Sequence, residues 1–170
     1  MSFHNEFLLF DITSIITFNS DICRNKVIQN NLIVIKKIIL EQIQDEQKDP
    51  VFCKIENLYK NNKILITKST HEKVKEMISD LGSENEKKNL LDFLNNVKII
   101  EDDPSEHFIN FKEKIWTKYN INIFGTAYKH NYIIVTGNIN ALNNLLNEKN
   151  LEIKFIAHRS RCFVGKNFEN

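Results

Sequence analysis

Glycine and proline are scarce in this chain, with 4 and 2 residues respectively among 170. The four glycines stand alone, so the sequence has no glycine-rich loop of the kind that cradles a dinucleotide or a nucleotide phosphate. Cysteine is also rare, and three cysteines without paired spacing predict neither a disulfide framework nor a zinc site. No serine lies in a nucleophile elbow, and the histidines do not pair at the spacing of helical metal ligands.

An excess of one charge and a long apolar run are missing as well. The 23 basic and 22 acidic residues leave a net charge of +1, so any surface that attracts nucleic acid must be local. No apolar stretch approaches the length of a membrane span, and no basic segment followed by an apolar one opens the chain. We therefore expect a cytoplasmic protein with no membrane partner.

Short apolar runs alternate with amphipathic patterns along the chain. The runs predict strands over residues 7–10, 63–67, 97–100, 132–136 and 151–156. Helical spacing predicts helices over residues 24–47, 51–60, 69–81, 84–95 and 104–119, then a helix that opens at Asn120 and another over 139–149. This alternation is typical of an α/β three-layer sandwich, with a mostly parallel sheet of 4–5 strands and helices on both faces.

Polar residues at strand ends and helix starts are the candidate site, because ligands bind at those places in an open α/β sheet. Asp11 directly follows the first strand, where a carboxylate is costly unless it caps a helix, pairs or binds a cation. Asn120 stands at a predicted helix start and Asn138 at a strand end, while Glu76 lies beside the apolar face of its helix. The alternative is that the first three are caps and Glu76 is a surface group.

Two charged clusters have structural explanations and functional ones. The acidic cluster of residues 101–103 precedes a helix, whose dipole it complements, although Asp102 or Asp103 could also reach the site. The last residues, 158–170, form a basic tail after a domain of residues 1–157. His158, Arg159, Arg161 and Lys166 lie there, either as a solvated tail or as a patch that follows a phosphate backbone.

In the order and spacing of these segments the chain resembles a PIN domain, the metal-dependent nuclease fold of toxin-type ribonucleases and RNA-processing endonucleases. Residues 7–14 resemble its first strand, which ends in Asp followed by Thr or Ser, and residues 64–77 resemble the strand and helix that carry its Glu. Residues 120–138 resemble its strongest segment, with a helix-opening acid, a buried Ala and a strand that ends in Val-Thr. The matching residues are Asp11, Thr13, Ser14, Glu76, Ala127, Val135 and Thr136.

The two remaining acids of the PIN pattern fall on Asn120 and Asn138. The resemblance implies that Asp11, Glu76, Asn120 and Asn138 form the catalytic set, with Asp11 and Glu76 as ligands of Mg²⁺ or Mn²⁺. Such cations prefer charged oxygen ligands, and an Asn neutralises none of their charge. Because Asn caps a helix about as well as Asp, the replacement keeps the local fold while it removes charge.

Three hypotheses follow. The first is a PIN-like domain with a weakened or lost metal site and no cofactor, which acts in RNA binding or processing or as a partner-binding subunit. The second is an active Mg²⁺- or Mn²⁺-dependent endoribonuclease that uses Asp11, Glu76 and a substitute acid. The third is an α/β domain whose four polar positions are only structural. RNA is the expected partner, with a protein partner or a homodimer as alternatives. The expected RNA contacts are Thr13, Ser14, Thr136, Arg159, Arg161 and Lys166.

Overall fold

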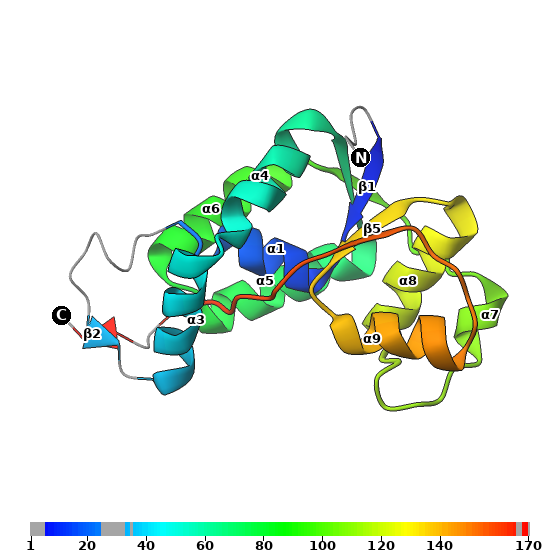
Figure 1. Cartoon of the computed structure of the whole chain (residues 1–170). Coiled ribbons are helices and arrows are strands. Elements are labelled where there is room, and N and C mark those ends of the chain that lie inside the picture. Colours follow the sequence, from blue (N-terminus) through cyan, green and yellow to red (C-terminus); the bar gives the residue numbers. More distant parts are fainter. Residues whose placement is uncertain (1–5, 25–32, 35, 166–167, 170) are drawn as a thin grey trace.

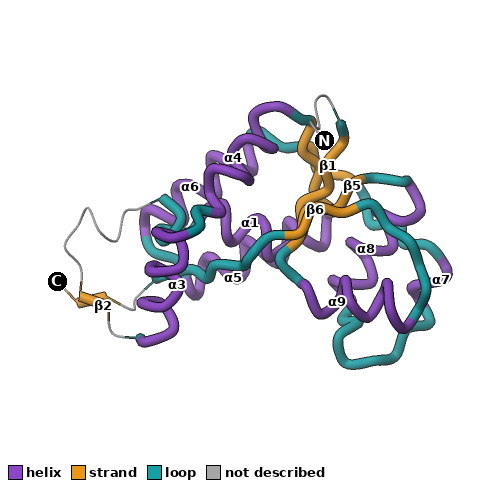
Figure 2. Tube along the Cα trace, viewed as in Figure 1, coloured by secondary structure: helices purple, strands orange, loops and turns teal. Residues whose placement is uncertain are grey.

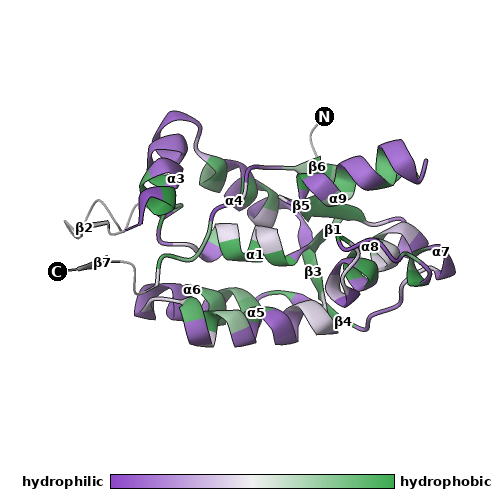
Figure 3. Cartoon of the chain, turned by 90° about the horizontal axis from the view of Figure 1, so that it is seen from below, coloured by the Kyte–Doolittle hydropathy of each residue, from purple (hydrophilic) through white to green (hydrophobic). Residues whose placement is uncertain are grey.

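Five parallel strands form the central sheet of the computed structural model, which describes residues 6–24, 33–34, 36–165 and 168–169. The sheet has the strand order β4-β3-β1-β5-β6 (Figure 3). These strands are β1 (Phe7–Phe10), β3 (Lys63–Thr67), β4 (Lys98–Ile100), β5 (Ile133–Thr136) and β6 (Phe155–Ala157). All four strand pairs run in parallel, so the carboxyl ends of the strands meet at one edge.

Alternate side chains of the strands enter two apolar cores on opposite faces of the sheet. Leu8 and Phe10 lie in the core under α1 (Ile12–Asn19), α4 (Val51–Asn61), α5 (Lys68–Leu81) and α6 (Glu84–Asn95). Leu9 lies in the core under α7 (Glu106–Ile109), α8 (Lys118–His130) and α9 (Ile139–Asn143), and α9 continues as the π-helix η1 (Asn144–Glu148). Helices therefore cover both faces, as Figures 1 and 2 show, and the apolar strands lie between them in Figure 3. The predicted fold class is confirmed.

The long helix predicted over residues 24–47 is wrong at residues 33 and 34, which form a strand. The helix α3 begins at Lys37 and ends at Lys48, and before it the strand β2 (Ile33–Val34) pairs antiparallel with β7 (Phe168–Glu169). β-branched residues favour a strand once a partner strand is available, and that partner lies more than a hundred residues away in the sequence. Residues 25–32 and 35 of the predicted helix lie outside the described residues.

The helix predicted over residues 104–119 is also wrong, because α7 has only four residues. After it the chain folds back so that the rings of Phe111 and Trp116 pack on Phe108 at 5.1 and 5.7 Å between centroids. Aromatic clustering here outweighs helical periodicity. The next helix, α8, is capped by Thr117 and not by Asn120.

Helix starts account for a further difference. The helix predicted over residues 69–81 begins one residue earlier, because Thr67 at the end of β3 accepts the amide of Thr70 and caps α5. A complete capping box is found between Ser83 and Glu86 at the start of α6. Among the residues that the structure describes, no helix combines the length and apolar character needed to cross a membrane.

Candidate active site at the carboxyl edge of the sheet

Asp11 lies at the point where β1 passes into α1, beside the end of the neighbouring strand β5. Its side chain is 3% exposed and caps α1 by accepting the amide of Ser14 at 2.8 Å. The Thr13 hydroxyl donates to both carboxylate oxygens, at 2.7 and 2.9 Å, and the Thr136 hydroxyl donates to the second of them. Burial raises the pKa of Asp11, and the hydrogen bonds from Thr136, Thr13 and Ser14 oppose that rise. The carboxylate is thus held by uncharged donors.

Asn138 continues this network from the end of β5. Its amide donates to the Thr136 hydroxyl at 2.9 Å, and its side-chain oxygen caps α9 at the amide of Ala141. Its side-chain nitrogen lies 3.5 Å from Oδ1 of Asn120, at the limit of hydrogen bonding. Asn120 lies in the first turn of α8, where it donates to the carbonyl of Ile115 at 2.6 Å. The structure therefore joins Asp11 to Asn138 through Thr136, and Asn120 meets this network only at the side chain of Asn138.

Glu76 has different surroundings. Its side chain is 60% exposed and pairs with Lys73 one turn earlier in α5, at 3.0 Å. In the described part of the chain, Glu76 forms no hydrogen bond or ion pair with Asp11, Asn120 or Asn138. The side chain of α5 that reaches towards the start of α8 is Lys73, whose ammonium lies 5.6 Å from the ring of Tyr119. The ion pair with Lys73 thus directs Glu76 away from the Asp11 network, and the role of Glu76 as a metal ligand stays a prediction.

The two acids considered as substitutes form other contacts. Asp102 accepts the amide and the hydroxyl of Ser69, at 3.1 and 2.6 Å. Asp103 binds Lys129 and His130, and these hydrogen bonds lower its pKa. Within the described ranges, no three His, Cys, Asp or Glu side chains gather in a way that could hold a metal ion.

His158 joins the site from the end of β6, and the sequence interpretation had placed it only in the basic tail. Its Nε2 lies 2.7 Å from the Ser14 hydroxyl, and its Nδ1 lies 2.9 Å from the carbonyl of Arg159. The Ser14 hydroxyl also lies 2.6 Å from the carbonyl of Val135. Carbonyls only accept, so all three contacts are satisfied together only when both ring nitrogens carry protons. The position of His158 in the sequence could have predicted this role, because the residue directly follows a strand at the carboxyl edge.

Two opposing effects set the charge of His158. Burial lowers its pKa, while the hydrogen bond to Arg159 and the charge of Asp11 raise it. Gly137 makes room for this arrangement, because a Cβ there would lie 2.2 Å from Oγ of Ser160 and 3.0 Å from Cε1 of His158. The net effect of burial and these contacts lowers the pKa of His158, and the segment that carries this residue fits closely against Gly137.

A family model described as "Protein of unknown function (DUF1308)" matches residues 8–167. The chain belongs to the DUF1308 family. It is also similar to a chain in the crystal structure of VapBC2 from Rickettsia felis bound to a DNA fragment from their promoter. That similarity has 16% sequence identity and a TM-score of 0.45, and it covers 89% of this chain and 98% of that chain.

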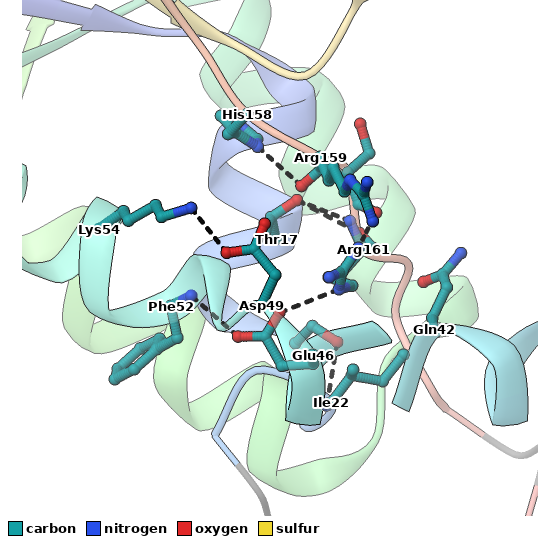
Figure 4. Close-up of polar contacts among 12 residues, drawn as sticks. Thr17, Ile22, Gln42, Glu46, Asp49, Phe52, Lys54, His158, Arg159 and Arg161 are labelled. Atoms are coloured by element: carbon teal, nitrogen blue, oxygen red, sulfur yellow. Dashed lines mark hydrogen bonds and ion pairs between the residues drawn. The ribbon is translucent and has the colours of Figure 1, made fainter. Parts of the chain in front are cut away.

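In this DUF1308 protein the segment after β6 packs into the domain, so the expectation of a solvated tail is wrong for residues 161–165. Figure 4 shows Arg161 directed at Glu46, with Nε and Oε2 3.0 Å apart and both side chains under 5% exposed. The Arg161 amide binds Thr17, and Glu86 accepts the amides of Val164 and Gly165 at 2.7 and 3.1 Å. The segment lies against α1, α3 and α6 because these buried acceptors hold it there.

The predicted RNA contacts differ in whether their side chains are exposed. Arg159 is exposed, whereas Arg161 could contact RNA only if its buried pair with Glu46 opened. Thr13, Ser14 and Thr136 direct their hydroxyls at protein acceptors. Lys166 lies outside the described residues. The division into a domain of residues 1–157 and a tail of 158–170 stays a prediction.

Proposed function

We propose that this chain is a PIN-like domain that has lost metal-dependent hydrolysis and binds RNA at the carboxyl edge of its sheet. The observation that carries the proposal is the surroundings of Asp11. Both oxygens of this carboxylate accept hydrogen bonds from uncharged donors, and the next side chains in the network, Asn138 and Asn120, are neutral amides. Mg²⁺ and Mn²⁺ need several oxygen ligands that neutralise their charge. This donor set does not fit such an ion.

An exposed cation beside the site supports a binding role. Arg159 is exposed and directly follows His158, which contacts Ser14 within the network. Its guanidinium can attract phosphate without a metal, and its contribution would weaken as salt rises. The site then holds a phosphodiester without activating water against it.

The test compares binding and cleavage on the same labelled single-stranded RNA. We expect binding in EDTA that weakens with salt, no products in Mg²⁺ or Mn²⁺, and a several-fold loss of affinity in Arg159→Glu. Lys114→Glu, an exposed charge reversal on the loop before α8, is the matched control and should bind as the wild type does. Metal-dependent cleavage that Asp11→Asn abolishes would establish the nuclease hypothesis instead.

A further inference from the structure

The amino edge of the sheet, opposite the Asp11 site, carries a row of lysines and aromatic rings, all of them exposed except the half-buried Tyr132. In strand order these are Lys98 at the start of β4, Lys63 at the start of β3, Phe7 at the start of β1, Tyr132 directly before β5 and Lys154 directly before β6. Neighbouring strands are ~4.8 Å apart, so the row spans roughly 19 Å. Each strand of the central sheet therefore has a cationic or aromatic side chain at its first residue or directly before it.

Two hollows open along this row and share Phe7. One, of about 510 Å³, is lined by Phe7, Tyr132 and Lys154 among others, and the second, also of about 510 Å³, by Phe7, Lys63 and Lys98 among others. Phe7 is 44% exposed, although it begins a strand whose next three residues are fully buried. An exposed ring shared by two hollows is positioned to stack on a ligand.

Phe7, Tyr132 and Lys63 of this row are held by contacts with neighbouring side chains. The Phe7 and Tyr132 rings lie 6.2 Å apart, and Tyr132 stacks on His130 at 5.5 Å. Lys63 lies opposite Phe7 in the strand register, with its ammonium 5.3 Å from the ring centroid. Among described residues, no ion pair is found for Lys63, Lys98 or Lys154, and Glu6 is the one acid that lines either hollow.

We propose that this amino-edge groove binds single-stranded nucleic acid, with a base stacked on Phe7 and phosphates at Lys63, Lys98 and Lys154. Base stacking on aromatic rings beside unpaired lysines is how sequence-tolerant binders hold a single strand. A protein partner of acidic character would satisfy the lysines and leave the exposed ring without a stacking ligand. The inference concerns residues that the Asp11 site does not use, so it stands or falls separately from the proposed function.

The experiment titrates labelled oligouridine and a duplex of equal length into the full chain across a salt series. Phe7→Ala is expected to lower single-strand affinity about tenfold, within the range for one stacked base, and Phe7→Tyr to retain it. Lys63→Glu with Lys98→Glu should weaken binding and reduce the salt slope by about 1.4. Lys88→Glu with Lys114→Glu, two exposed lysines outside both hollows, is the matched control pair.

Photo-crosslinking with 4-thiouridine identifies which edge of the sheet is occupied. Crosslinks in peptides that contain Phe7 or Tyr132 support the groove. Crosslinks confined to residues 158–160, affinities of the Phe7 and lysine variants within twofold of wild type, or no single-strand binding at all overturn it. If Phe7→Ala no longer shows the circular dichroism spectrum of the folded chain, its affinity is not used, and the single-strand affinity of the Lys63→Glu with Lys98→Glu variant tests the groove. Loss of binding in Arg159→Glu alone would overturn the groove and leave the proposed function standing.

Discussion

The Ser14 hydroxyl lies 2.7 Å from Nε2 of His158, a residue 144 positions away in the sequence. This contact joins the start of α1 to the segment after β6, next to the buried carboxylate of Asp11. The polar site therefore consists of strand ends that only the parallel sheet brings together. Its stability and its charge depend on the same few hydrogen bonds.

His158 gives the first prediction, on pH. Its pKa is lowered by burial, so the native chain binds its proton less readily than the unfolded chain, whose imidazole has a pKa of about 6.5. Stability contributed by this group is present above pH ~6.5 and is lost as pH falls towards the lowered pKa. The loss is about 1.4 kcal/mol for each pH unit that separates the native pKa from the unfolded one. Urea unfolding at pH 7.5 and pH 5.5 should show a smaller pH effect in His158→Gln than in wild type.

Exposed His107 supplies the control for this comparison. His107→Gln should retain the pH dependence of the wild type. If His158→Gln also retains the pH dependence of the wild type, His158 has the same pKa in the native and unfolded chains, and the argument that burial lowers it is wrong.

Asp11 gives the second prediction, on stability. Asp11→Ala removes the α1 cap and leaves the hydroxyls of Thr13 and Thr136 without their acceptor, so we expect a loss on the order of 2–4 kcal/mol. Asp11→Asn keeps one acceptor and should cost less. Chemical denaturation measures both, and equal costs for the two variants would contradict this account of the network.

The buried pair of Arg161 and Glu46 gives the third prediction. Either partner alone would leave an uncompensated buried charge, so Arg161→Met should cost roughly 3–5 kcal/mol. The double variant Arg161→Met with Glu46→Leu should cost clearly less than the sum of the single changes. Lys54→Ala, which breaks an exposed pair with Asp49, should change stability by under about 1 kcal/mol. Additive costs for Arg161 and Glu46 would show that the two charges are not coupled.

Gly137 gives the fourth prediction, on the fit of the last segment. Gly137→Ala places a Cβ against Ser160 and should destabilise the fold by ~1–3 kcal/mol, as overpacking does. Ser160→Ala removes the nearest atom, so the double variant should recover part of the loss. Thermal unfolding of the four proteins in this cycle tests it. A Gly137→Ala variant as stable as wild type would mean that the segment after β6 packs less closely than described.

The strands were predictable because their apolar character is local. Four of the five predicted strands agree with the observed ones to within a residue, while the last is shorter and ends one residue later, at Ala157. The caps were less predictable, since Thr67 and Ser69 both stand near one helix start and only packing decides between them. Asn120 and His158 depend on contacts between distant segments. A single sequence does not show such contacts.

Metal binding is the most direct test of the central claim that the Asp11 network does not hold a catalytic ion. Isothermal titration with Mn²⁺ on the wild-type chain should give no heat of binding. Asn138→Asp, which keeps the oxygen that caps α9 and adds a charge near Asp11, should gain weak Mn²⁺ affinity, and Asn143→Asp on the same helix should not. Stoichiometric Mn²⁺ binding by the wild type that Asp11→Asn removes would contradict the account.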